Sequence, residues 1–124
     1  MKNQRPKNLN LLTIRFPIPA IASILHRASG FVLFLAIPFI LWGLSLSLDS
    51  QQGFDNLHQA LSSVWIRFLI WAILSAFLYH FVAGLRHLLM DIGIGESRTG
   101  GKVSAILTIV IAAALIILAG IRLW

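Results

Sequence analysis

Three long apolar stretches, separated by short polar segments, dominate the hydrophobic pattern of the chain. They predict helices over residues 21–48, 63–90 and 103–122. A helix rises about 1.5 Å per residue, so about 20 apolar residues cross a hydrocarbon core of about 30 Å. The pattern therefore predicts an all-α integral membrane protein with three transmembrane helices.

The polar segments divide the chain into two predicted regions. Residues 1–20 form a basic arm, and residues 21–124 form a membrane anchor domain with connecting loops over 49–62 and 91–102. Three prolines in the arm, Pro6, Pro17 and Pro19, favour an extended or irregular course. Pro38 inside the first span favours a kink. The apolar stretch after the arm is too long for the core of a secretory signal peptide.

The composition excludes several classes of protein. The chain has 124 residues, of which 58% are hydrophobic and only 11% are charged, whereas soluble domains average about 45–50% apolar and about 25% charged residues. A self-contained soluble enzyme, a DNA-binding module and a disordered tail are therefore excluded. The chain has no cysteine, which excludes disulfides, thiolate metal sites, iron–sulfur ligation and c-type haem attachment.

The distribution of basic residues predicts the orientation in the membrane. The net charge is +6, but the basic residues lie outside the apolar stretches or near their ends. We therefore interpret this charge as a topology signal and expect no nucleic-acid partner. The first loop has no Lys or Arg. The arm has Lys2, Arg5, Lys7 and Arg15, and the second loop has Arg98 and Lys102. The positive-inside rule places the N-terminus in the cytoplasm and the C-terminus in the periplasm.

A first polar cluster lies at the cytoplasmic end of the first span. Ser23 and Arg27 are four residues apart and share a helical face, with His26 beside them. A hydroxyl, an imidazole and a guanidinium at the edge of the apolar layer suit a polar headgroup on an apolar tail, such as a quinone. The alternative is that Arg27 extends to the interface and binds lipid phosphate.

A second cluster lies deeper, in the second span. His80, Gly84 and His87 have the spacing of one helical stripe, and His80 lies roughly 15 Å inside the cytoplasmic end of the span. A buried imidazole needs a partner, and haem iron is the strongest candidate in a bundle without cysteine. Gly84 would let a flat macrocycle approach, while Arg86 and His87 could meet haem propionates. The alternative is a histidine hydrogen-bonded to another helix.

Both clusters resemble motifs of the cytochrome b-type large membrane anchor subunit of succinate dehydrogenase (succinate:quinone oxidoreductase, respiratory complex II). That family has an N-terminal Arg-Pro, a Ser-x-x-His-Arg-x-Ser/Thr element and a His-x-x-x-Gly-x-Arg-His…Asp-x-Gly element. Here these are Arg5-Pro6, residues 23–29 and residues 80–93. Lys7 departs from the pattern, because an apolar residue is more usual after the Arg-Pro. The length, the three spans and their intervals also match, so the resemblance covers essentially the whole chain.

The resemblance implies a role for each of these residues. His80 is expected to be an axial ligand of haem b (the metal ligand of this chain), with the second axial ligand from the small membrane anchor subunit. Ser23 and Arg27 are expected to bind ubiquinone, with His26 close by. Arg27 and His87 are expected to meet the haem propionates.

The resemblance also implies partners and a location. The expected partners are the flavoprotein, the iron–sulfur subunit, the small anchor subunit and membrane lipid. The three helices would then form part of a multi-subunit helical bundle. Succinate oxidation, a step of the tricarboxylic acid cycle, would supply electrons to ubiquinone at the bacterial inner membrane. The chain would then be a multi-pass subunit of an electron-transport enzyme and not catalytic alone. Two alternatives stay open at this point: an anchor of quinol:fumarate reductase, and a non-redox subunit of a small transporter or an assembly factor.

Overall fold

A computed structural model describes residues 9–124, which form four helices. Helix α1 spans Ile18–Asp49, α2 spans Gln51–Leu61, α3 spans Val64–Asp91 and α4 spans Arg98–Leu123. The three long helices are each long and apolar enough to cross a membrane. The all-α fold with three candidate spans is thereby confirmed.

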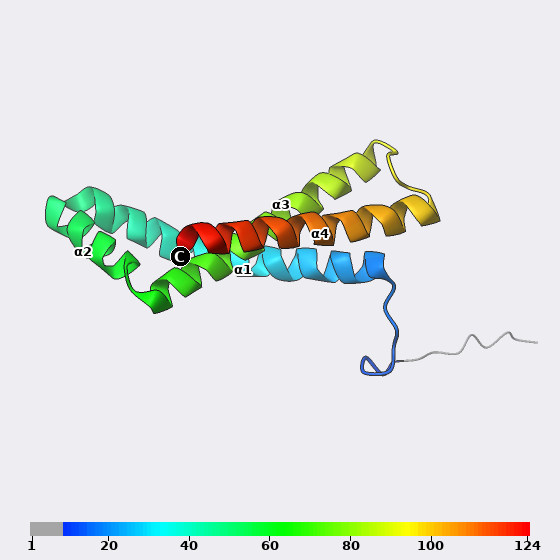
Figure 1. Cartoon of the computed structure of the whole chain (residues 1–124), viewed down its shortest axis with the longest axis horizontal. Helices are drawn as coiled ribbons and strands as arrows, with labels where there is room; N and C mark the ends of the chain where they lie inside the picture. Colours follow the sequence, from blue (N-terminus) through cyan, green and yellow to red (C-terminus); the bar gives the residue numbers. More distant parts are fainter. Residues whose placement is uncertain (1–8) are drawn as a thin grey trace, which may run out of the picture.

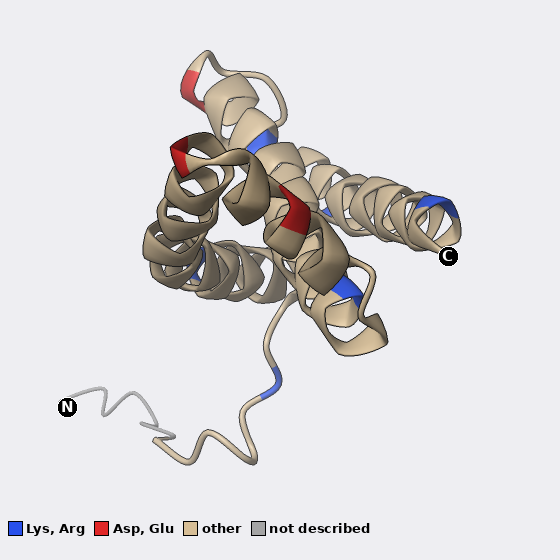
Figure 2. Ribbon diagram, turned by 90° about the vertical axis from the view of Figure 1, so that its left-hand side faces the viewer, with Lys and Arg blue, Asp and Glu red and all other residues tan. Residues whose placement is uncertain are grey.

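The three long helices pack side by side (Figure 1). Helix α3 is the central helix of the three. It packs extensively against both α1 and α4, whereas α1 and α4 pack less extensively against each other. The start of α1 and the α3–α4 loop lie at one end of the bundle, and α2 lies at the other end. Most of the ribbon carries no charged residue (Figure 2). This arrangement matches the alternation of apolar and polar segments in the sequence.

The start of α1 differs from the prediction by three residues, because the prolines begin the helix instead of preceding it. Pro17 is the N-cap and Pro19 lies in the first turn, where the missing N–H costs nothing and the fixed φ angle suits a helix. Part of the predicted arm, including the Arg5-Pro6 motif and the basic residues Lys2 and Lys7, lies outside the described residues.

Residues 49–62 were expected to form a loop, and this prediction is wrong, because most of the segment is α2. The Ser50 hydroxyl accepts the Gly53 N–H at 3.0 Å and caps the helix. Side-chain pairs four residues apart, Gln51 with Asp55 at 3.0 Å and Gln52 with Asn56 at 2.9 Å, support its polar face. Its apolar side chains turn toward α1 and α3: Leu57, Ala60 and Leu61. Helix α2 is therefore a short amphipathic helix.

The second loop is shorter than predicted, since α4 already begins at Arg98. The Ser97 hydroxyl accepts the Gly100 N–H at 2.9 Å and caps this helix. Helix α3 ends in a Schellman motif, in which the N–H of Gly93 donates to Met90 O and that of Ile94 donates to Leu89 O. Gly93 has a φ angle of +87°, a conformation that costs other residues a steric clash. The chain thus reverses direction within six residues, 92–97.

The buried positions of the bundle belong mostly to small residues. Those of α1 recur every seven residues and those of α4 every three or four. They are Ala22, Ser29, Ala36, Ala83, Ala105, Thr108 and Ala112, and Arg86 is the exception. Within the described residues no large side chain is completely buried, and many large apolar side chains face outward. Small interface residues with apolar outer faces are typical of helices that pack within a bilayer.

Two aromatic side chains link α3 to its neighbours through hydrogen bonds. The Tyr79 hydroxyl donates to Ala22 O of α1 at 2.8 Å, and the Trp71 indole N–H donates to Ile116 O of α4 at 3.0 Å. Without water nearby, such bonds satisfy groups that lipid would leave unpaired. They therefore fix the positions of α1 and α4 against α3.

Substitution of Gly120 tests the packing of α4 on Trp71. A Cβ atom at this position would lie 3.1 Å from Trp71 Nε1. We expect Gly120→Ala to displace the indole and to destabilise the bundle by about 1–3 kcal/mol, the usual cost of overpacking. Gly43→Ala is the control, since its Cβ would lie 4.0 Å from the nearest atom, Leu57 Cδ1. Thermal unfolding in detergent, followed by circular dichroism, compares the two. Equal midpoints would contradict the expected clash.

Candidate functional site

Three histidine side chains from α1 and α3 form one stack inside the cytoplasmic half predicted from the sequence. The His26 ring lies between the other two, with its centroid 4.1 Å from that of His80 and 4.8 Å from that of His87. The rings are nearly parallel, at 19° and 22°. The two clusters that the sequence marked separately are thus partly joined, because α1 and α3 pack with His26 between the two histidines of α3.

The His80 ring is held against α1 through its Nδ1 atom. Nδ1 lies 3.1 Å from His26 O and 3.1 Å from Ser29 Oγ. A carbonyl oxygen can only accept a hydrogen bond, so Nδ1 carries the proton. A neutral imidazole with its proton on Nδ1 presents Nε2 as a lone-pair nitrogen, which is the form in which histidine binds a metal.

Gly30 permits this close approach. A Cβ atom at Gly30 would lie 3.0 Å from His80 Cε1 and 3.4 Å from Nδ1. At Gly84, the glycine that the sequence pattern marked, a Cβ would lie 3.8 Å from His26 Nε2, an ordinary contact. A side chain at position 30 would therefore make the His80 ring shift by a few tenths of an ångström, whereas position 84 has room for a Cβ atom.

Two polar groups of the stack differ in how they are satisfied. The His87 ring donates from Nδ1 to Ala83 O of its own helix at 2.7 Å. The His26 Nε2 atom is buried and has no hydrogen-bond partner within residues 9–124. A buried polar nitrogen without a partner costs free energy, and His26 Nε2 is the one such side-chain atom in residues 9–124.

The other predicted quinone-site residues lie apart from the stack. Ser23 is half-buried and Arg27 is exposed. Within the described residues, no hydrogen bond or ion pair involves either side chain. Arg27 is therefore not bonded to the three rings, and its guanidinium is free to meet a ligand or a partner. The structure places His26 with the histidines and leaves Ser23 and Arg27 at the edge of the site.

Arg86 points toward α4 and does not join the stack. It is only 7% exposed. Its Nε donates to Ser104 Oγ at 3.0 Å, and one terminal nitrogen donates to Gly101 O at 3.3 Å. A buried guanidinium is tolerated when its donors are used. The suggestion that Arg86 meets a propionate therefore finds no support in this geometry, because its contacts fasten the start of α4 to α3.

The stack is not arranged as a site for a free metal ion. No group of three or more His, Asp or Glu side chains in residues 9–124 could hold an ion, because the imidazoles lie face to face and do not converge on a point. A centre that takes a single histidine from this chain fits better. A haem with one axial ligand from α3 needs only the free Nε2 of His80.

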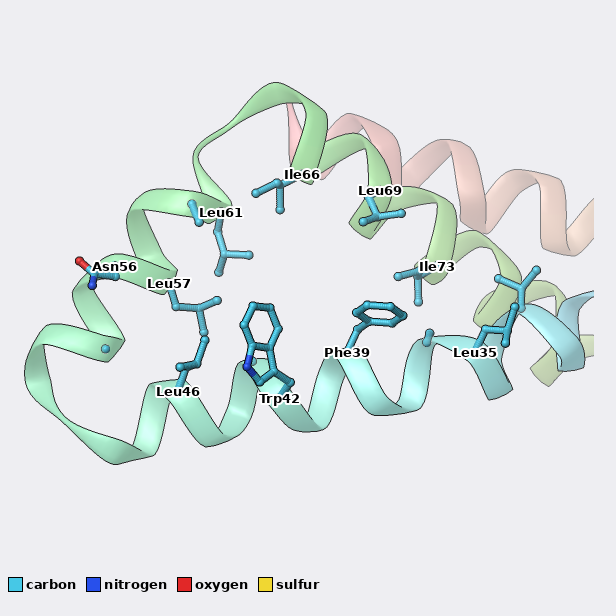
Figure 3. Close-up of a pocket in the computed structure, with 15 residues that line it drawn as sticks. Leu35, Phe39, Trp42, Leu46, Asn56, Leu57, Leu61, Ile66, Leu69 and Ile73 are labelled. Atoms are coloured by element: carbon cyan, nitrogen blue, oxygen red, sulfur yellow. The ribbon is translucent and has the colours of Figure 1, made fainter.

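A separate apolar cavity lies at the other end of the bundle (Figure 3). It has a volume of about 740 Å³ and lies between α1, α2 and α3. Phe39 and Trp42 of α1 point into it, and Leu57 of α2 and Ile73 of α3 line it. None of the residues that the sequence marked for quinone or haem lines this cavity.

The sequence analysis did not assign roles to Ser29 and Gly30. Ser29 is the last residue of the matched element, residues 23–29, and Gly30 follows it directly, so the two lie three and four residues after His26. Their role becomes apparent only when α3 is placed against them. A small residue next to a polar motif was the available signal, and small residues favour close helix contacts in membranes.

Comparisons with known proteins match the whole length of the chain. The family model described as succinate dehydrogenase/fumarate reductase transmembrane subunit matches residues 1–119. The chain is 45% identical to a succinate dehydrogenase cytochrome b556 subunit of Coxiella burnetii, over 100% of both chains. Proteins of the same name from Rickettsia felis and Paracoccus denitrificans are 36% and 35% identical, over 77% and 76% of this chain and 73% and 72% of theirs. The chain therefore belongs to the family of succinate dehydrogenase/fumarate reductase transmembrane subunits.

Proposed function

We propose that this chain is the haem b- and quinone-binding membrane anchor of a succinate:ubiquinone oxidoreductase. One observation carries the proposal: α1 holds His80 by its Nδ1 atom, which leaves Nε2 as a ligand nitrogen within the membrane span. The relatives are named cytochrome b556 subunits, and that name implies a haem b. The second axial ligand would come from the small anchor subunit.

The residues of this chain fit a haem in three respects. His80 offers one neutral imidazole nitrogen. The buried Nε2 of His26 lacks a partner in the described residues, so a polar group of the cofactor or of a partner subunit can satisfy it. His87 and Arg27 supply the donors that we expect at the propionates. When bound, the haem would supply a one-electron redox centre next to the quinone.

Quinone binding is proposed for the edge of the site. Arg27 is exposed and makes no hydrogen bond or ion pair in the described chain, and Ser23 lies one turn away on the same helix. We infer that these two side chains donate hydrogen bonds to a quinone carbonyl as negative charge develops on its oxygen, with His26 nearby. The isoprenoid tail would lie among the apolar side chains that face the lipid.

The electrons would come from partner subunits. The chain has no cysteine, so it holds no iron–sulfur cluster of its own. We infer that an iron–sulfur subunit, capped by a flavoprotein that oxidises succinate, docks on the cytoplasmic side. The bundle in Figure 1 places the N-terminal end of α1 and the α3–α4 loop together, in agreement with a basic cytoplasmic face. The C-terminus would then be periplasmic.

A fumarate reductase anchor is the second candidate, because the matching family model covers both enzymes. The relatives named here are all succinate dehydrogenase subunits, which favours succinate oxidation. Membership of this family argues against a transporter or assembly factor.

The first test is a visible difference spectrum of the complex, purified in mild detergent through a tag on this chain. We expect dithionite-reduced minus air-oxidised protein to show b-type haem bands, together with co-purified flavoprotein and iron–sulfur subunits. A complex that contains those partners but no haem would refute the haem assignment. Comparison of succinate oxidation by ubiquinone with fumarate reduction by quinol then separates the two enzyme directions.

A further inference from the structure

We propose that Ser29 and Gly30 are positioning residues for the iron ligand: they hold the His80 ring in the tautomer and orientation that present Nε2. This inference rests on the proposed function, because it assumes that His80 binds haem. The inference goes beyond the proposed function because it assigns the orientation of the His80 ring, on α3, to two residues of α1. We call the His26 carbonyl, Ser29 and Gly30 the His80 contact surface of α1.

Ser29 fixes the direction of the hydrogen bond to His80. Its side chain is only 7% exposed, and its hydroxyl donates to His26 O at 2.8 Å. The hydroxyl proton is therefore committed, and the Oγ lone pairs face His80 Nδ1 at 3.1 Å. Both neighbours of Nδ1, Ser29 Oγ and His26 O, thus act as acceptors. In a neutral imidazole this arrangement selects the tautomer with the proton on Nδ1 and a lone pair on Nε2.

Gly30 fixes how closely the ring can approach α1. A Cβ atom there would lie 3.0 Å from His80 Cε1, which is tighter than most real Cβ contacts, so the ring would have to shift by a few tenths of an ångström. The ring is covered on one face by His26, at 4.1 Å between centroids. A side chain at position 30 would therefore push the imidazole along or out of the stack, and the Nε2 lone pair would change direction with it.

Acceptors at Nδ1 also change the electronic character of a ligand. A histidine that donates its second N–H to an acceptor is a more basic ligand, and a more basic ligand stabilises ferric over ferrous iron. Removal of the Ser29 oxygen leaves only the His26 carbonyl. The haem should then be easier to reduce, while the ring keeps its place.

The test is the midpoint potential of the haem in the purified complex. We expect Ser29→Ala to retain haem and to shift the ferrous-to-ferric ratio about threefold toward ferrous, which is roughly 28 mV for a one-electron couple at 59 mV per tenfold. Ser75→Ala is the matched control. The Ser75 hydroxyl also donates to a carbonyl of its own helix, Trp71 O at 2.6 Å, and is part-buried in the same bundle, but it is not bonded to a histidine. Ser29→Thr restores the hydroxyl and should restore the potential.

Gly30→Ala provides a second measurement that does not depend on the hydroxyl. We expect a lower haem-to-protein ratio and altered low-spin ferric signals in electron paramagnetic resonance, because the imidazole plane turns. Gly43→Ala, with room for a Cβ atom, should leave both unchanged. If the Ser29→Ala complex fails to assemble, the Gly30→Ala complex still tests whether α1 positions the His80 ring.

The outcomes separate this inference from the proposed function. Absence of haem from the unsubstituted complex would refute the haem assignment itself. The positioning role alone would be overturned by a different result, in which the unsubstituted complex contains haem but the substitutions have no specific effect. In that case Ser29→Ala would have the same potential as Ser75→Ala. Gly30→Ala would have the same resonance signals as Gly43→Ala. A shifted potential that Ser29→Thr restores would support it.

Discussion

His80→Ala is expected to remove haem b from the assembled complex. The substitution deletes the imidazole that α1 holds by its Nδ1 atom, and with it the Nε2 nitrogen that we propose as the iron ligand. Mutation of a residue that only supports a metal ligand costs about 10–100-fold in metal affinity. Loss of the ligand itself should cost at least as much, so we expect the haem content to fall at least tenfold. The reduced-minus-oxidised spectrum of the purified complex measures this, and added imidazole should restore part of the signal if the vacated space admits it.

His58→Ala is the matched control for that experiment. His58 lies on α2, at the other end of the bundle, where its exposed ring stacks on Phe54 at 6.4 Å between centroids. It should leave the haem content unchanged. Succinate oxidation by a soluble dye reports whether the head subunits remain attached. Full haem content in an assembled His80→Ala complex would show that iron takes another ligand.

Arg27→Leu is expected to lower quinone reduction by about 10²-fold or more, the usual effect of removing one donor that stabilises a developing oxyanion. Reduction of a soluble dye by succinate should stay at the level of the unsubstituted complex, because that electron path ends before the membrane. Arg27→Lys should be intermediate, since lysine keeps the charge and loses the planar pair of donors. Steady-state rates with the two acceptors measure the difference.

Arg122→Leu is the control for the charge change, because Arg122 is exposed in the last turn of α4, close to the C-terminus. It should affect neither acceptor. Equal losses with quinone and dye in Arg27→Leu would point to failed assembly and would count against a quinone contact. Unchanged quinone reduction would refute the quinone contact and would favour the alternative that the sequence left open, in which Arg27 binds lipid phosphate.

The three spans could be predicted because their length and hydropathy are fixed by the thickness of the bilayer. The ends of the helices were predicted less accurately than their existence. Pro17 and Pro19 were interpreted as features of an irregular arm, although proline also suits a first helical turn. Helix α2 was missed because its many polar residues resemble a loop. The spacing of Phe54, Leu57 and Leu61 was the helical signal.

The site was partly predictable for a different reason. The stripe of His80 and His87 follows from helical periodicity within one span, so the sequence suffices to place them together. The insertion of His26 between them depends on how α1 packs on α3, which no local pattern specifies. The same holds for Arg86, whose turn toward Ser104 was not predicted because the partner lies on another helix.

The small residues at the helix contacts have a consequence for how the subunit is made. Because Ala22, Ala83 and Ala105 are buried while most large apolar side chains face outward, each span can enter the bilayer by itself, and helix pairing afterwards gains little from leaving water. Close backbone contact and a few directional bonds, such as that of Tyr79, then hold the helices together. A newly synthesised copy without its partners should consequently be a loosely associated set of inserted helices, recognisable to membrane proteases, and its abundance in the cell should follow the supply of the other subunits.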